Sequence, residues 1–176
     1  MQKYLLFVPF CFVCASVLGQ DNCKNTIYET IDEATQQTLL SSKEIPVLSG
    51  KKVDFKINFY FLKRDSVFSL KVDCITKDMN SQMSIFYIHL FLEEGKEIWL
   101  EDYKTGTVKT IVKNKSVTAA KQTYFKLSKE QVETLMEDEI RSIEIRYFNQ
   151  KEEPYSREII GIKTALKIKT VVACMQ

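Results

Sequence analysis

Hydrophobic residues alternate with polar residues over the middle of the chain, from about residue 52 to residue 127. In the segment 53–61 every odd position is apolar, and the segments 68–74 and 86–92 repeat the period of two at their even positions. Successive side chains of a strand point to opposite faces, so this period predicts strands with one buried face. Apolar segments at 98–100, 108–112, 117 and 123–127 extend the series, with turns predicted at 94–96, 105–106 and 114–115.

A helical pattern follows directly after this series. Ser128 is a good N-cap residue, and Gln131 three positions later completes a capping box. Val132, Leu135 and Met136 then form one apolar stripe at helical spacing. We therefore predict an internal helix over about 128–139.

The two ends of the chain carry weaker patterns. The segments 26–31 and 36–40 predict a hairpin turning at 32–35, and the segments 143–147 and 157–162 predict two further strands. Residues 164–175 predict a terminal helix, although Leu166 and Ile168 also alternate and a last strand stays open as the alternative. The fold class is therefore mainly β (α+β), an antiparallel β-sandwich or partly open barrel with one internal helix and a C-terminal helix.

The first nineteen residues have the layout of a secretory signal peptide. Lys3 precedes a continuous apolar run from Tyr4 to Val17, and small residues at Val17 and Gly19 place a cleavage site before Gln20. The run is short for a membrane span; a retained anchor or a buried N-terminal helix are the alternatives. We expect a signal peptide at 1–19, a single β-rich domain at 20–176, a secreted or periplasmic location, and no membrane span after cleavage.

Charge and cysteine usage narrow the possible functions. The chain has 25 Lys and Arg and 23 Asp and Glu, and this near-balance argues against a nucleic-acid binder. Cys23, Cys74 and Cys174 remain after cleavage, which allows one internal disulfide. Cys23–Cys174 is the favoured pair because domain termini often lie close together, whereas Cys74 alternates with core positions and is expected to be a buried thiol. With a single histidine and no CxxC in the mature chain, we expect no metal site and no cofactor.

The stretch from Tyr124 to Leu135, the segment 140–146 and a terminal helix carrying Cys174 together resemble small exported proteins of Bacteroidota-type bacteria with no assigned function. The resemblance covers roughly residues 84–176, and its motif is a capped helix between two strands. It implies a β-rich exported domain and transfers no catalytic residue.

Candidate chemistry is sparse. His89 could serve as a general base, but if the strands 67–75 and 84–92 pair as a hairpin, Cys74 opposes Phe86 and points inward while His89 points outward, which excludes a thiolate–imidazolium dyad. The acidic clusters at 93–94, 101–102, 137–139 and 152–153 are expected to be solvated charges. We therefore name no catalytic residue.

The second sheet face offers a binding surface instead. Several large side chains are predicted to lie on the sheet face that points away from the main core. If they are exposed they form a binding site, and if a second layer covers them they belong to the core. The candidate binding residues are Tyr60, Tyr87, His89, Phe91 and Trp99, with Leu62 on the same face.

Three functions are consistent with these observations. The favoured one is an exported, non-catalytic binding or structural module with an unknown partner. The alternative is a barrel that encloses a small apolar ligand in a pocket lined by Phe55, Phe59, Phe68 and Phe86. The third is a hydrolase that uses His89. The expected partner is thus a protein or a small apolar ligand.

Overall fold

The computed structural model describes residues 23–31, 36–48, 55–76, 84–101, 103–113, 116–148 and 155–176. The expected signal peptide over residues 1–19 lies outside these described residues. The elements in chain order are β1 (Ile27–Ile31), β2 (Thr38–Ser42), β3 (Ile45–Leu48), β4 (Phe55–Arg64), β5 (Val67–Thr76), β6 (Ser84–Leu92), β7 (Glu97–Leu100), β8 (Tyr103–Lys113), β9 (Ser116–Leu127), α2 (Lys129–Glu137), β10 (Ile140–Phe148), β11 (Tyr155–Ile159) and α3 (Ile162–Cys174).

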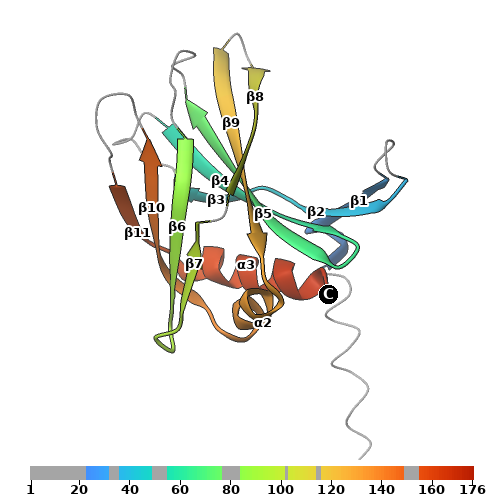
Figure 1. Ribbon diagram of the computed structural model, residues 1–176, viewed down its shortest axis with the longest axis vertical. Helices are drawn as coiled ribbons and strands as arrows, with labels where there is room; N and C mark the ends of the chain where they lie inside the picture. The colour runs from blue at the N-terminus through green and yellow to red at the C-terminus, as the bar shows by residue number, and fades with distance from the viewer. Residues whose placement is uncertain are drawn as a thin grey trace, which may run out of the picture.

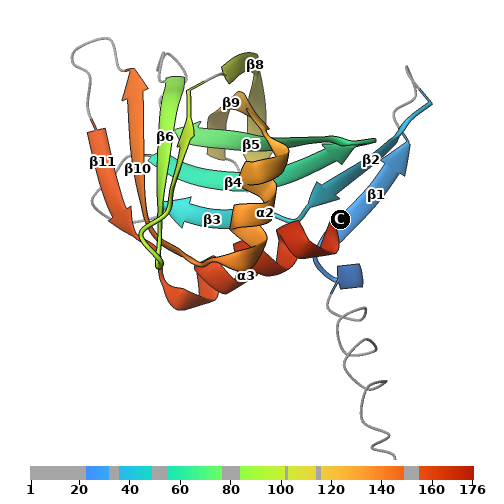
Figure 2. The ribbon, with the colours of Figure 1, turned by 60° about the horizontal axis from the view of Figure 1, so that its bottom comes forward.

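The strands form two antiparallel sheets. The seven-stranded sheet has the order β1-β2-β4-β5-β9-β8, with β3 also paired to β4, and the four-stranded sheet has the order β11-β10-β6-β7. The sheets face each other, and α2 and α3 lie across one end of them (Figures 1 and 2). The molecule is therefore a mainly β, α+β sandwich that does not close into a barrel, in agreement with the first of the two predicted architectures.

The core lies between the sheets and continues under the helices. Each central strand contributes alternate residues to it, as the period of two predicts. The buried positions include Ile57, Phe59, Phe61, Leu70 and Val72 of the larger sheet, Ile88, Leu90, Ile143 and Ile145 of the smaller sheet, and Val132, Leu135, Ile168, Val171 and Val172 of the helices. One continuous apolar cluster thus joins both sheets to both helices.

The hairpin considered between 67–75 and 84–92, as a test of a Cys74–His89 dyad, does not form. Strand β5 pairs with β4 and β9, whereas β6 pairs with β10 and β7 in the other sheet. Each of the two strands has one apolar face. That face is buried whether the other strand lies beside it in the same sheet or opposite it across the core. Alternation alone therefore could not choose between the two arrangements.

Two other local predictions also need correction. Thr105–Gly106 is not a turn, because β8 runs through it and absorbs the irregularity as a shift of register between Thr105 and Val108. Glycine inside a strand often marks such a bulge. A second shift of register lies in β6, between the pairs that Tyr87 and Ile85 form with β10. The side chain of Ile85 is consequently in the core, whereas strict alternation predicted that the side chain at position 86 points inward.

The internal helix follows from local chemistry, and the terminal helix is settled by its packing. Ser128 Oγ accepts a hydrogen bond from Gln131 N at 3.1 Å, and Gln131 Oε1 accepts one from Ser128 N at 2.8 Å, so the capping box is confirmed. The terminal segment is a helix rather than a strand. Its residues Ala165, Ile168, Val171 and Val172 form a buried stripe at helical spacing, and that stripe completes the core.

The two ends of the described chain are covalently joined. Cys23 and Cys174 form a disulfide with a Cα–Cα distance of 5.5 Å, the pair that the sequence analysis favoured. Cys74 is a free, buried thiol on the inner face of β5. Burial raises its pKa to about 12, so at neutral pH it is protonated and poorly nucleophilic.

Candidate functional site

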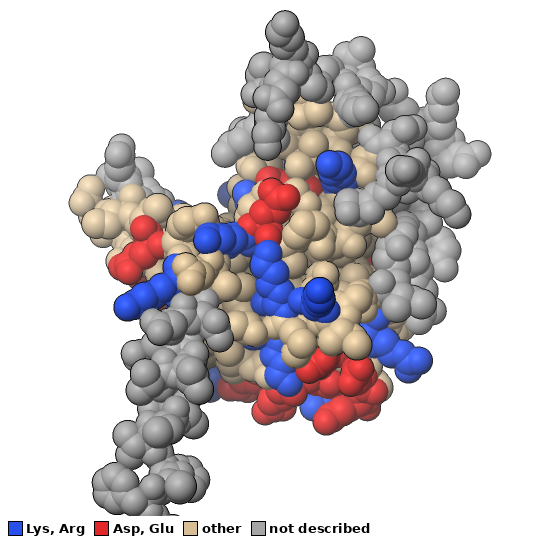
Figure 3. Space-filling view, turned by 180° about the vertical axis from the view of Figure 1, so that it is seen from behind, with Lys and Arg blue, Asp and Glu red and all other residues tan. Residues whose placement is uncertain are grey.

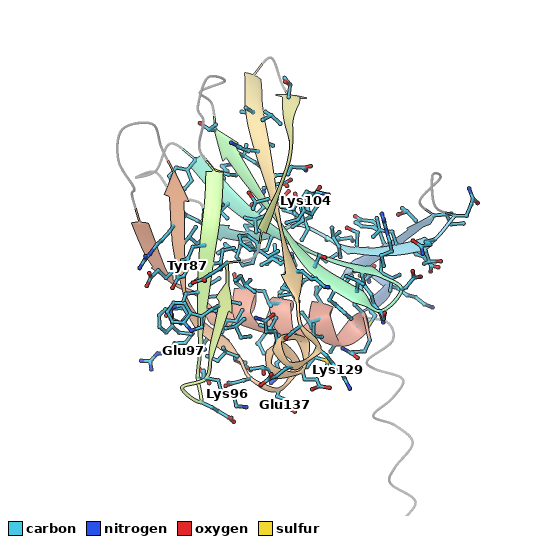
Figure 4. All side chains as sticks on the ribbon, in the orientation of Figure 1. Tyr87, Lys96, Glu97, Lys104, Lys129 and Glu137 are labelled. Carbon is cyan, nitrogen blue, oxygen red and sulfur yellow. A yellow bond between two sulfur atoms is a disulfide. The ribbon has the colours of Figure 1, made fainter. Side chains whose placement is uncertain are left out.

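Four of the five candidate binding residues meet on one surface. Tyr87, His89 and Phe91 occupy alternate positions of β6, and Trp99 on the neighbouring β7 pairs directly with His89. Their intervening neighbours, such as Ile88 and Leu90, point into the core, so the four rings lie on the outer face of the four-stranded sheet. Figure 4 shows Tyr87 on this side of β6. We call Tyr87, His89, Phe91 and Trp99 the aromatic platform.

The rings of the aromatic platform pack directly on one another. The His89 ring stacks on Trp99 with 3.6 Å between centroids and lies 3.8 Å from the Phe91 ring. Tyr87 meets Trp99 edge-on at 5.5 Å. His89 is only 4% exposed, whereas Trp99 is 49% exposed. Trp99 therefore covers the imidazole and still presents a large indole surface to solvent.

Charged side chains surround the aromatic platform. Glu97 Oε2 lies 3.1 Å from His89 Nε2, and the Arg146 guanidinium lies 4.8 Å above the Tyr87 ring. Arg146 Nη2 also lies 3.4 Å from Glu144 Oε1. Burial and the nearby Glu144 carboxylate raise the pKa of Tyr87, and Glu101 contributes to the same shift. Among the residues whose side chains are described, three carboxylates and one guanidinium thus lie around the platform.

The geometry around His89 does not favour catalysis. Its Nε2 is engaged by Glu97, and its ring contacts Trp99 and Phe91. Cys74 lies on the inner face of the other sheet, so it cannot approach His89. Ser142 is buried on the same face as His89, but the residue directly opposite it on β6 is Phe91 and not His89. An imidazole covered on its ring by aromatic groups suits packing better than proton transfer to a substrate.

Tyr60 is separated from the other candidates. It lies on β4 in the seven-stranded sheet, where its hydroxyl donates to Glu44 Oε2 at 3.3 Å and its ring carries Lys71 Nζ at 3.9 Å. Burial, followed by the Glu44 charge, raises the pKa of Tyr60. Alternation within a single sheet would put Tyr60 beside the other rings, whereas the structure has two sheets and the core separates their outer faces.

Sequence reasoning missed several polar residues on the outer face around Tyr60. Asn58, Asp73 and Gln122 occupy paired positions on β4, β5 and β9 and are buried. Gln122 Nε2 donates to Asp73 Oδ1 at 3.2 Å, and Lys71 Nζ lies 3.5 Å from Asp73 Oδ2. Their alternation with apolar residues predicted only that they lie on the outer face of a sheet, and it did not predict that they are buried there.

The acidic clusters are mostly solvated, with two exceptions just after α2. Glu93, Glu94, Glu101 and Glu137 are exposed, and Lys96 bridges Glu94 and Glu137 at 3.2 and 3.8 Å (Figure 4). Asp138 is instead buried. Its carboxylate accepts from Glu94 N at 3.2 Å and from Glu139 N at 2.8 Å, so it fastens the β6–β7 turn to the end of α2. Glu139 is half-buried, and the remaining acidic residues, 102, 152 and 153, lie outside the described part of the chain.

The phenylalanines expected to line an apolar ligand pocket differ in how deeply they are buried. Phe59 and Phe68 belong to the continuous core, and Phe55 is half-buried against it; the side chain at position 86 is outside the description. Phe59 and Phe68 therefore act as packing residues between the sheets.

No protein-family model matches the chain, and a comparison with curated proteins finds no match. Within the described residues, neither helix combines the length and the apolar character needed to span a membrane. The same residues contain no group of three or more His, Cys, Asp or Glu side chains placed to hold a metal ion.

Proposed function

We propose that the mature chain is an exported, non-catalytic module that binds a partner protein through the aromatic platform. One observation carries this proposal: Trp99 is half-exposed while it stacks on the buried imidazole of His89. A large apolar ring held rigid by its neighbours loses little conformational entropy when a partner covers it. Such a ring is therefore an efficient anchor for binding.

The composition of the surface supports a protein partner. Tryptophan and arginine are among the residues enriched in binding hot spots, and the exposed Trp99 and Arg146 lie on either side of the buried Tyr87 ring, which contacts both. An aromatic centre with a charged border also follows the usual arrangement of a protein interface, with an apolar core and a polar rim. Three adjacent strands carry the surface, so it is broad rather than enclosed, whereas small-molecule sites are usually concave.

The charges around the platform specify the chemistry of the partner. Among the described side chains Glu97, Glu101 and Glu144 outnumber Arg146, and we expect the partner to present an apolar side chain flanked by Lys or Arg. Complementary charges speed association, and salt screens that effect. Binding should consequently weaken as the salt concentration rises.

The first experiment identifies the partner and measures the role of Trp99. The purified protein is immobilised, extracytoplasmic proteins of the producing organism are passed over it, and any retained protein is identified, purified and titrated against variants. Trp99→Ala should raise the Kd about thirtyfold, the effect of losing a hot-spot residue worth roughly 2 kcal/mol. Val67→Ala is the matched control, because Val67 is 46% exposed on the other sheet.

The outcomes separate the proposal from its rivals. A large loss with Trp99→Ala and a change below about threefold with Val67→Ala would support it. Equal effects of the two variants, or retention only of an apolar small molecule, would contradict it. The second result would favour the ligand-binding alternative.

A second experiment separates binding from hydrolysis. His89→Phe keeps a flat ring beneath Trp99 but removes the imidazole nitrogens, whereas His89→Ala removes the ring as well. If His89 only positions Trp99, His89→Phe should retain binding within a few-fold and His89→Ala should lose more. If His89 is a general base, both variants should lose about 10²–10⁴-fold in any turnover of the captured partner.

A further inference from the structure

An open pocket lies on the outer face of the seven-stranded sheet, on the side of the molecule away from the aromatic platform. Its volume is about 480 Å³, within the range of roughly 300–1,000 Å³ that suits small ligands. It is lined by Tyr28, Ser41, Ser42, Lys43, Glu44, Tyr60, Lys71 and Lys167. We call it the lysine pocket.

The hollow lies where β2 and β3 meet along β4. Strands β2 and β3 both pair with β4, β2 with its second half and β3 with its first half. Lys43 and Glu44 connect β2 to β3, and the β1–β2 hairpin leaves the sheet at this point as an arm (Figure 1). Lys43 N donates to Thr26 O at 2.8 Å, and Lys167 Nζ from α3 donates to Glu44 O at 2.7 Å. The arm, the sheet and the terminal helix therefore all contribute walls.

The lysines of the pocket are unusually enclosed. Lys43, Lys71 and Lys167 are each half-buried, although lysine is normally an exposed residue. Two of the ammonium groups lie over tyrosine rings, Lys43 Nζ at 5.5 Å from the Tyr28 centroid and Lys71 Nζ at 3.9 Å from that of Tyr60. Figure 3 shows the molecule from behind, with Lys or Arg side chains beside Asp or Glu side chains near the centre of the view.

The charges in the pocket do not cancel. Lys71 has a partial partner in Asp73 at 3.5 Å, and the Glu44 carboxylate accepts from the Tyr60 hydroxyl at 3.3 Å. Three ammonium groups therefore face two carboxylates, and Lys43 and Lys167 contact only a ring and a backbone carbonyl among the interactions described. Neither of those contacts neutralises a charge, so the pocket has positive charge available for an anion.

We propose that the lysine pocket binds a small hydroxylated anion, such as a sugar acid or a sugar phosphate. The ammonium groups of Lys43 and Lys167 take the carboxylate or phosphate as point charges. The Glu44 carboxylate accepts hydrogen bonds from ligand hydroxyls, and the half-exposed Tyr28 ring covers the apolar side of the sugar. This site is independent of the aromatic platform, which lies on the outer face of the other sheet.

The test uses three probes that differ only in their acidic group: glucose, glucuronate and glucose 6-phosphate. Each is titrated by calorimetry and by amide chemical shifts into the protein purified from an exporting host. Glucuronate, glucose 6-phosphate or both should bind at least about tenfold more tightly than glucose, since a charge-assisted hydrogen bond is about twice as strong as a neutral one. The shift changes should fall on the lining residues.

Matched lysine variants locate the site. Lys167→Met should weaken binding of the anionic probe about tenfold, and Lys43→Met should do the same if the first variant disturbs α3. Lys126→Met is the control, because Lys126 is an exposed lysine on the same sheet and its replacement makes the same change in net charge. Trp99→Ala should leave anion binding unchanged.

The proposal is overturned if the anions bind no more tightly than glucose, or if none of the probes binds with a Kd below about 10 mM. It is also overturned if Lys126→Met weakens binding of the anion as much as Lys167→Met does. A preference for glucuronate over glucose 6-phosphate supports it and assigns a carboxylate ligand, and the reverse preference supports it and assigns a phosphate.

Discussion

Replacing both cysteines of the disulfide, Cys23→Ser together with Cys174→Ser, should lower the free energy of unfolding by several kcal/mol. The two residues are 151 positions apart. The loop-entropy relation for a cross-linked unfolded chain gives about 5 kcal/mol at 25 °C for a loop of that length. Native disulfides typically contribute about 2–5 kcal/mol when measured, so we expect a loss of about 3–5 kcal/mol.

The native structure should survive this change, because other contacts hold the terminal helix. Val171, Val172 and Met175 are fully buried in the core next to Cys174, and Lys63 Nζ donates to Gln176 O at 2.7 Å. The loss should therefore come mainly from the freedom that the unfolded chain regains. The circular dichroism spectrum at 25 °C should change little, while the guanidinium midpoint should fall by about 1 M.

Reduction provides the control. Dithiothreitol should destabilise the wild-type protein by the same amount as the double substitution, and it should leave the double variant unchanged. A double variant within about 1 kcal/mol of the wild type would refute the reasoning, since the loop term alone predicts more. Destabilisation of the double variant by dithiothreitol would show that the reductant acts elsewhere.

Three further predictions concern other features of the chain. Ser128→Ala should lower stability by about 1 kcal/mol in denaturant melts because a first-turn N–H loses its acceptor, and Ser128→Asp, which retains an acceptor, should stay near the wild-type value; equal losses would mean that the side chain does not cap the helix. Cys74 should resist maleimide at pH 8 for as long as the protein is folded, and the free energy of unfolding should fall as the pH rises from about 9 towards 12, because the thiol ionises first in the unfolded chain. Rapid labelling of the native protein, or an equal fall in stability at high pH in Cys74→Ala, would contradict this. Mature protein from the native host should begin at or within a few residues of Gln20, outside the cytoplasm, and intact Met1 in a cytoplasmic fraction would contradict the signal-peptide interpretation.

The aromatic platform was half predictable. The alternation of β6 placed Tyr87, His89 and Phe91 on one outward face, because the side-chain period of a strand is set by its backbone. That Trp99 stacks on His89, and that Glu97 reaches its Nε2, depends on the pairing of β6 with β7 in one particular register. The short segments around the β6–β7 turn are compatible with that hairpin, but the pattern does not set which rings meet.

The lysine pocket had no signal in the sequence. Its walls come from Lys43, Lys71 and Lys167, which are 28 and 96 positions apart along the chain by their numbers, and each one alone resembles an ordinary surface lysine. They meet because β2 and β3 share β4 and because α3 packs back against β3. Tyr60 was singled out correctly as an outward residue, yet its neighbours could not be.

The sequence by itself determined much of the local structure of this protein: most of the strands, the buried faces of the central ones, and the capped start of α2. It did not predict β3, and it left the terminal segment open between a helix and a strand, which the packing of Ile168 and Val171 into the core decides. The predicted features depend on interactions within a few residues, where backbone geometry and side-chain spacing suffice. Beyond the β1–β2 hairpin, which the sequence predicted, the tertiary structure decided which strands became neighbours, and β5 and β6 therefore lie in different sheets rather than forming a hairpin. An apolar face is attracted to any other apolar face, because the hydrophobic effect is not directional, and the choice among partners rests on how the whole chain fills one core. The aromatic platform and the lysine pocket both arise from that choice, and so they appear only in the folded molecule.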